Sequence, residues 1–137
     1  MEAVIAANEA FYEAWEAGDK AQLRSMWLDS DDVVSVHPGV DPEAGDVMLA
    51  TFDELVDQVN GTGTQFFVSE VSVAVVGDVA RVVCVENCVT TVPTELQLVD
   101  YSRLGTTNLF RRTPDGWRIW HHHAGPVVPV LRPEPEA

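Results

Sequence analysis

Residues 107–124 read Thr-Asn-Leu-Phe-Arg-Arg-Thr-Pro-Asp-Gly-Trp-Arg-Ile-Trp-His-His-His-Ala, two β-rich runs on either side of a turn. Pro114-Asp115-Gly116 is typical of a tight turn, because proline fixes φ and glycine tolerates a positive φ. The segment therefore predicts a hairpin formed by residues 98–113 and 116–124.

The strand-like pattern extends upstream to residue 65. Residues 65–76 and 79–92 are rich in β-branched and apolar residues, and Gly77-Asp78 between them is a hairpin signal. Pro93-Thr94-Glu95 predicts a longer, less regular connection to the next strand. The second half of the chain thus predicts four consecutive strands.

The beginning of the chain has helical periodicity instead. Residues 2–17 carry an apolar stripe opposite a row of glutamates, and Gly18 supplies a stop. Asp19 and Gln22 resemble a capping box, which predicts that a second, shorter helix begins here. The pair predicts a helical hairpin.

A third helix follows a short strand. Residues 33–37 predict the strand, residues 38–46 predict a loop, and an apolar face then recurs at helical spacing up to Gly61. Helices grouped before antiparallel strands indicate an α+β fold, because a parallel sheet would alternate the two. Three amphipathic helices on one curved sheet leave a cavity at the mouth between the layers.

The composition of the chain excludes some classes of binding partner and indicates its cellular compartment. The chain has 137 residues, 22 acidic and 8 basic side chains, and a formal charge of −14. Such a surface repels phosphate backbones and anionic lipid, so we expect neither nucleic acid nor membrane as a partner. No apolar run approaches the roughly 20 residues of a membrane span. With no signal-peptide pattern and two cysteines placed too far apart along one strand to pair, we expect a cytoplasmic protein.

Residues 11–19, 32–39 and 107–124 resemble the SnoaL-like domain family, within the superfamily that also contains ketosteroid isomerase. The resemblance implies a cone-shaped, barrel-like α+β fold. In it, three N-terminal helices pack on a strongly bent, mostly antiparallel sheet that encloses a pocket, commonly in a homodimer. Residues 1–128 form this domain, and the proline content of residues 129–137 predicts an extended tail.

Four side chains are candidates for acid–base catalysis. His37 ends a predicted strand at its rim, and an imidazole titrates near neutral pH. Glu86 shares a strand face with apolar residues and thiols, where its pKa should rise. In the last strand, simple alternation places His121 and His123 on one face with Ile119, where they could flank a substrate.

Each candidate also has a structural interpretation. His37 could pin the loop that follows it, and Glu86 could form a buried salt bridge with Arg103 or Arg111. The last-strand histidines could be core or dimer-interface residues. A metal site would require His37 to approach them in space, and no further ligand has suitable spacing, so we predict no metal and no cofactor.

Four residues are candidates for substrate binding. Trp15, Trp27 and Tyr101 have rings that suit a largely apolar pocket, although Trp15 also fits a core position. Asn108 shares a face with Thr106, and its amide could orient a carbonyl or a hydroxyl group.

Two functions fit these residues. The first is cofactor-independent, isomerase- or cyclase-type proton transfer on a small, largely apolar carbonyl compound. His37 or Glu86 would move the proton, and Asn108 or His121 would stabilise the enolate oxygen. The second is a non-catalytic domain that binds a small apolar molecule or mediates dimeric interaction. Activities in the family are diverse, so the resemblance does not choose between the two.

Overall fold

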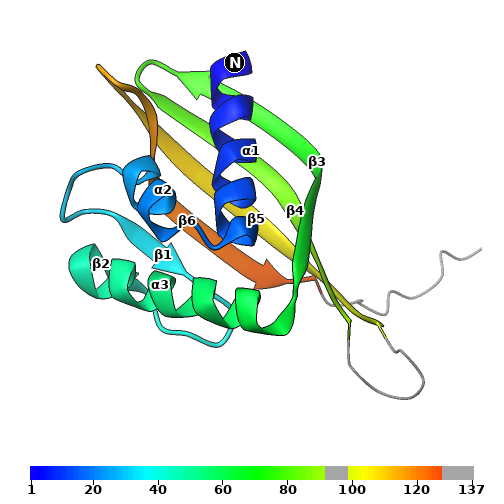
Figure 1. The fold of residues 1–137 in the computed structure, drawn as a ribbon. Coiled ribbons are helices and arrows are strands. Elements are labelled where there is room, and N and C mark those ends of the chain that lie inside the picture. Colours follow the sequence, from blue (N-terminus) through cyan, green and yellow to red (C-terminus); the bar gives the residue numbers. More distant parts are fainter. Residues whose placement is uncertain (92–98, 128–137) are drawn as a thin grey trace, which may run out of the picture.

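The structure is a computed structural model that describes residues 1–91 and 99–127. Within these residues the chain forms helices that lie together on one face of a sheet (Figure 1). In chain order the elements are α1 (Glu2–Ala17), α2 (Lys20–Met26), β1 (Val34–Val36), β2 (Glu43–Ala44), α3 (Gly45–Thr62), β3 (Gln65–Val76), β4 (Val79–Thr91), β5 (Val99–Thr113) and β6 (Gly116–Pro126).

The sheet is mixed and open. Its strand order is β2-β1-β6-β5-β4-β3, with β1 parallel to β6 and every other neighbouring pair antiparallel. The predicted α+β class and the mostly antiparallel sheet are confirmed. Because β1 is only three residues long, the edge formed by β1 and β2 leaves the cone unclosed.

The predicted end of the first helix and the predicted start of the second are both confirmed. Gly18 adopts a left-handed φ of 71° and caps α1. The side chain of Asp19 accepts a hydrogen bond of 3.1 Å from the backbone N–H of Gln22 and so caps α2. The third helix differs from its prediction, because it ends at Thr62 and is capped by Gly63, whereas Gly61 was expected just past its end. Gly63 has the positive φ of 69° that allows its N–H to reach the last carbonyls.

The segment predicted as a loop also contains structure. Residues 43–44 form β2 and pair with β1, and α3 begins directly afterwards at Gly45. A two-residue strand has too few side chains for a period-two pattern, so sequence alternation does not reveal it. The predicted connection at residues 93–95 and the predicted tail at residues 129–137 lie outside the described residues.

A bulge in β6 changes which histidine faces the core. Adjacent residues of β5 pair with Ile119 and His121, so Trp120 is an extra residue between them. An extra residue reverses the alternation of faces beyond it. The next residue after Ile119 on the inner face of the strand is therefore His122, and both side chains are fully buried. The prediction that Ile119, His121 and His123 share one face is wrong, because it assumed an unbroken strand.

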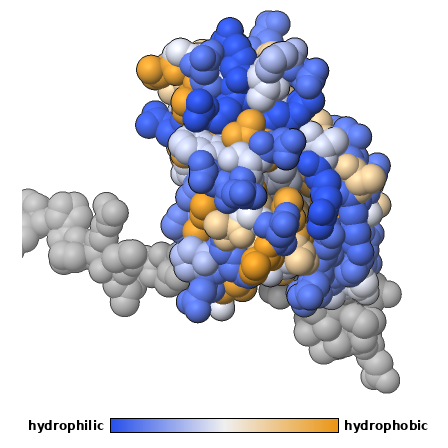
Figure 2. Space-filling view, turned by 90° about the vertical axis from the view of Figure 1, so that its left-hand side faces the viewer, coloured by the Kyte–Doolittle hydropathy of each residue, from blue (hydrophilic) through white to orange (hydrophobic). Residues whose placement is uncertain are grey.

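The core fills the space between the helices and the concave side of the sheet. Its largest members are aromatic and cluster around Phe11, whose ring contacts those of Trp15, Trp27 and Phe52. No helix in the described part of the chain is both long and apolar enough to cross a membrane. The face seen in Figure 2 is mostly hydrophilic, with small, separate hydrophobic patches.

We predict that Asp19→Ala lowers the free energy of unfolding by about 1 kcal/mol, because the first turn of α2 loses its cap. Asp19→Asn is the matched control, since it removes the same charge but keeps an oxygen that can accept from Gln22. Urea unfolding of both variants measures the difference. Equal losses in both would show that the charge, and not the cap, contributes the stability.

Candidate functional site

A cavity of about 340 Å³ lies between the helices and the concave side of the sheet. Volumes of this size accommodate small organic molecules. Most of the wall is apolar, and Phe66 and Leu104 are among its members. Polar groups come from three sides, with His37 after β1, Gln58 on α3 and Glu86 on β4. Among the described residues, no lysine or arginine lines this cavity.

Glu86 lies at the wall of the cavity and is 1% exposed. The hydroxyl of Tyr12, on α1, donates a hydrogen bond of 2.5 Å to Oε2 of Glu86. Burial raises the pKa of Glu86 from 4.5 to about 7, although the hydroxyls of Tyr12 and Thr106 partly offset this. The carboxyl group can therefore both release and accept a proton near neutral pH.

The salt bridge considered for Glu86 is not formed. Arg103 pairs instead with Glu70, at 2.6 Å. Arg111 lies over the ring of Trp120, 5.2 Å from its centroid. The interpretation of Glu86 as a member of a buried salt bridge with either arginine is therefore wrong.

His122 lies directly behind Glu86. Its ring is fully buried, and Nε2 is 3.8 Å from Oε2 of Glu86. Burial, together with the nearby His37, lowers the pKa of His122 well below its ordinary value. The ring is therefore neutral, and the two groups form neither an ion pair nor a hydrogen bond at this distance. Nε2 has no hydrogen-bond partner among the described residues.

An amide pair completes this buried network. Asn108 Nδ2 donates to Oδ1 of Asn8 at 2.9 Å and to the hydroxyl of Tyr12 at 3.1 Å. Asn108 Oδ1 lies 2.6 Å from Nδ1 of His122. Asn8 and Asn108 are 2% and 0% exposed, so these contacts are shielded from water. The predicted shared face of Asn108 and Thr106 is confirmed, but the amide of Asn108 is engaged within the protein and does not line the cavity.

His37 and Trp15 form another part of the wall. His37 Nε2 is 2.6 Å from the hydroxyl oxygen of Ser35, so its side chain bonds β1 and not the loop that follows. Burial lowers the pKa of His37 to about 4, which leaves the ring neutral. Trp15 lines the cavity as a predicted binding residue would. Its indole Nε1 is buried without a hydrogen-bond partner within the described part of the chain.

Four predicted site residues lie elsewhere. His121 and His123 are on the outer face of β6, where their rings are 6.3 Å apart. Tyr101 is half exposed, and its hydroxyl donates to Asn87 at 2.6 Å. Trp27 is buried in the core and lines a different cleft. The bulge displaces the two histidines, whereas the hydroxyl of Tyr101 bonds Asn87 and the ring of Trp27 packs against Phe11 and Phe52.

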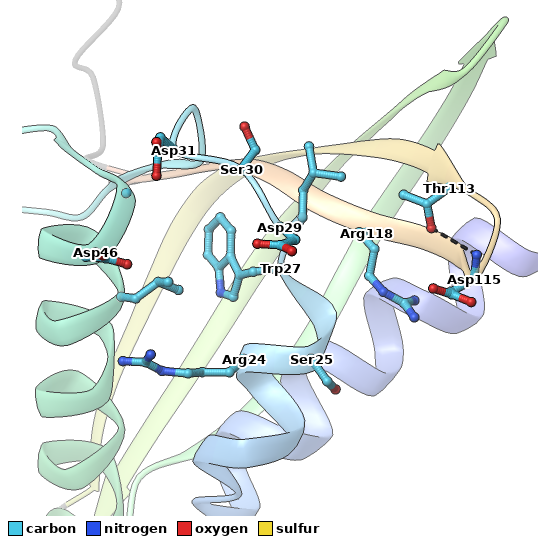
Figure 3. Close-up of a pocket in the computed structure, with 13 residues that line it drawn as sticks. Arg24, Ser25, Trp27, Asp29, Ser30, Asp31, Asp46, Thr113, Asp115 and Arg118 are labelled. Atoms are coloured by element: carbon cyan, nitrogen blue, oxygen red, sulfur yellow. Dashed lines mark hydrogen bonds between the residues drawn. The ribbon is translucent and has the colours of Figure 1, made fainter.

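That cleft, of about 770 Å³, opens between α2, the start of α3 and the β5–β6 hairpin (Figure 3). Its labelled side chains are mostly charged or hydroxyl-bearing, and Arg24 is already paired with Asp53 at 3.1 Å. None of the residues of the buried network lines it. The described residues also contain no group of three side chains placed to hold a metal ion. We therefore take the smaller cavity beside Glu86 as the candidate site.

Sequence reasoning missed three residues of this site, namely Asn8, Tyr12 and His122. Asn8 and Tyr12 are four residues apart on α1 and fall within the apolar stripe of that helix. Two polar residues at helical spacing on a buried face are a signal that could have identified them.

The fold and the site define a small α+β pocket protein with a buried carboxyl group at the wall of its cavity and a buried imidazole next to that carboxyl group. The sequence model of the SnoaL-like domain matches residues 4–129. The chain therefore belongs to the SnoaL-like domain family. A comparison with curated proteins gives no match.

Solved structures agree with this assignment. A candidate dehydratase of the NTF2-like family from Streptomyces avermitilis is 38% identical, covers 93% of this chain and 97% of its own, and has a TM-score of 0.82. A ketosteroid isomerase-like protein from Erwinia carotovora atroseptica is 20% identical, with coverages of 94% and 97% and a TM-score of 0.70. The CaMKII hub of S. rosetta is 18% identical, with coverages of 92% and 95% and a TM-score of 0.78. The last two show the fold alone, and the homodimer implied by the resemblance stays a prediction.

We predict that Glu86→Gln stabilises the protein at pH 8 and has little effect at pH 4.5. With a native pKa raised from 4.5 to about 7, the unfolded chain loses this proton at lower pH than the native protein does. The free energy of unfolding therefore falls as the pH rises from 4.5 to about 7. At about 1.4 kcal/mol per pKa unit, the ionisation of Glu86 lowers the free energy of unfolding at pH 8 by an amount on the order of 3 kcal/mol.

Urea unfolding at both pH values measures this effect. Glutamine keeps an oxygen for the Tyr12 hydroxyl but cannot ionise. Glu54→Gln, on the exposed surface of α3, is the control and should not change the pH dependence. A loss of stability for Glu86→Gln at pH 8 would mean that the native pKa of Glu86 is not raised and that the protein stabilises its carboxylate.

Proposed function

We propose that the chain is an acid–base enzyme of isomerase or dehydratase type, acting on a small, largely apolar carbonyl compound. The observation that carries the proposal is Glu86, a carboxyl group at the wall of a mostly apolar cavity with a pKa of about 7. A general acid or base is most effective when its pKa is near the working pH. The 38% identical relative, a candidate dehydratase, supports the same class of reaction.

The arrangement supports a sequence of proton transfers. A carbonyl compound in the cavity would place an α-carbon against Glu86, whose carboxylate removes the proton from that carbon. The C–H electron pair forms a C=C bond while the π pair of the carbonyl group moves to its oxygen, which gives an enolate. Glu86 then returns the proton, either to another carbon in an isomerisation or to a leaving hydroxyl group, which departs as water in a dehydration.

Trp15 is the side chain suited to stabilising the enolate oxygen. Trp15 lines the cavity, and its buried Nε1–H has no acceptor among the described residues. A preorganised donor in a dry site favours the charge that develops in the transition state. The residues first considered for this role do not reach the cavity, since Asn108 is engaged with Asn8 and His121 faces outward.

A non-catalytic binding domain is the second candidate function. The observation that favours it is the mutual satisfaction of the buried groups, because Tyr12, Asn8 and Asn108 all bond one another or Glu86. Holding the wall of a binding pocket in place would be a sufficient role for such a network, without any catalysis. The two candidates differ in whether a bound carbonyl compound exchanges its α-protons.

We predict that the protein catalyses exchange of the α-protons of 2-tetralone, an uncharged bicyclic ketone, in D₂O near neutral pD. NMR follows the loss of the α-proton signals. Glu86→Gln should lower the catalysed rate by about 10²-fold or more, as expected when a general base is removed. Glu54→Gln should keep the wild-type rate, because this glutamate is exposed and does not line the cavity.

Two outcomes would contradict the proposal. If Glu86→Gln exchanges protons as fast as the wild type, Glu86 is not the base. If 2-tetralone binds saturably but no uncharged ketone is exchanged faster than in buffer, the domain binds without catalysis.

We also predict that the cavity discriminates against anions. None of its described wall residues is a lysine or an arginine, and transfer of an unpaired carboxylate into such a site is costly. At pH 8, 2-acetylnaphthalene should bind at least about tenfold more tightly than 2-naphthoate, a difference of 1.4 kcal/mol. Equilibrium dialysis measures both affinities, and Glu86→Gln should reduce but not remove the difference. Equal affinities would show that a cation reaches the bound molecule.

A further inference from the structure

The buried network fixes the position of the proton on His122. Asn108 uses Nδ2 to donate to both Asn8 and Tyr12, so the atom that it turns toward His122 is the oxygen. An amide oxygen can only accept, and therefore Nδ1 of His122 carries the hydrogen. In a neutral ring, Nε2 then has a lone pair and no hydrogen. This bare nitrogen faces Oε2 of Glu86 at 3.8 Å.

We propose that Asn8 and Asn108 are positioning residues of the site, which hold His122 in the Nδ1–H form and so turn the lone pair of its Nε2 toward Glu86. The inference rests on the proposed function, in which Glu86 exchanges a proton with the substrate. His122 does not line the cavity, so it acts through Glu86.

The assignment favours the protonated state of Glu86, because the lone pair of Nε2 disfavours a negative charge on the oxygen that it faces. A carboxylate in this position is therefore a stronger base than an ordinary one. It takes the α-proton of the substrate, and an O–H bond forms as the C–H bond breaks. Return of this proton to the product restores the carboxylate. No other reactant is required.

The titratable groups packed around Glu86 and His122 stay neutral while Glu86 exchanges a proton. Burial raises the pKa of Tyr12 well above its ordinary value, and burial raises the pKa of Cys84 and of Cys88 to about 11. His37, whose ring centroid is 5.2 Å from that of His122, is neutral because burial lowers its pKa to about 4. On β6 itself, burial and the neighbouring His123 lower the pKa of His121. Glu43 is the charged group that acts on His37, and it opposes the lowering of its pKa.

NMR of the ¹⁵N-labelled full chain tests the proposal without any substrate. Two-bond ¹H–¹⁵N spectra distinguish the protonated from the bare ring nitrogen of a histidine. We expect the Nδ1–H form for His122 at pH 7 in the wild-type protein. A protonated Nε2 with a bare Nδ1 would overturn the proposal, and this measurement depends on no variant folding.

A matched pair of variants tests the role of the amides. In Asn108→Asp, a carboxylate faces Nδ1 of His122, so the ring becomes an imidazolium, and the side-chain carboxyl titration of Glu86 moves down by about one pH unit or more. Asn8→Asp adds the same charge on the same network but keeps an oxygen that accepts from Asn108. It should leave His122 in the Nδ1–H form and should not lower the titration of Glu86. ¹³C NMR of the Glu86 carboxyl group measures its titration in both variants.

The outcomes separate this inference from the proposed function. An unchanged or raised titration of Glu86 in Asn108→Asp would overturn the role of Asn108 as a positioning residue, even if the enzyme exchanges ketone protons. If the wild type exchanges ketone protons, the pH profile of the exchange should move with the titration of Glu86 in Asn108→Asp. If the predicted forms of His122 are seen but no exchange occurs, the network is as described and the proposed function is wrong.

Discussion

A carboxyl group placed among apolar side chains must find hydrogen-bond partners, and much of this fold is arranged around that requirement. Glu86 is buried on β4, between the sheet and the helices. Its partner, Tyr12, comes from α1, so a single hydrogen bond ties the first helix to the middle of the sheet. One turn earlier on the same helix, Asn8 accepts from Asn108 on β5. Leaving either buried group unpaired would cost about 1–3 kcal/mol, so these contacts fix where α1 lies on the sheet.

Local patterns were sufficient to predict the order of every described element except β2, and most of their limits. Gly18 and Asp19 mark the end of one helix and the beginning of the next by their own backbone and side-chain chemistry. Glu86 could be singled out because an acidic residue among alternating apolar ones is costly wherever the strand packs. Each of these conclusions depends on residues within a few positions of one another. Interactions of that kind are readable from a single sequence.

The composition of the site was less predictable, for two physical reasons. The bulge at Trp120 is set by the pairing of β6 with β5, and it moves His122 to the inner face in place of His121. Alternation alone has no means of registering an extra residue. The partnership of Tyr12 with Glu86 joins residues 74 positions apart in the chain, and only the tertiary fold brings them together.

The chemistry of Glu86 itself argues that the group is there for more than architecture. If the network served only to hold α1 on the sheet, a glutamine would accept equally well from Tyr12 and would leave no ionisable group to destabilise the native protein above pH 5. A glutamate gives up that stability because its native pKa is raised by burial. What it supplies in exchange is a proton that can leave and return near neutral pH, at the wall of a cavity with room for a small molecule. A titratable group retained at such a cost is the arrangement expected of an acid–base site.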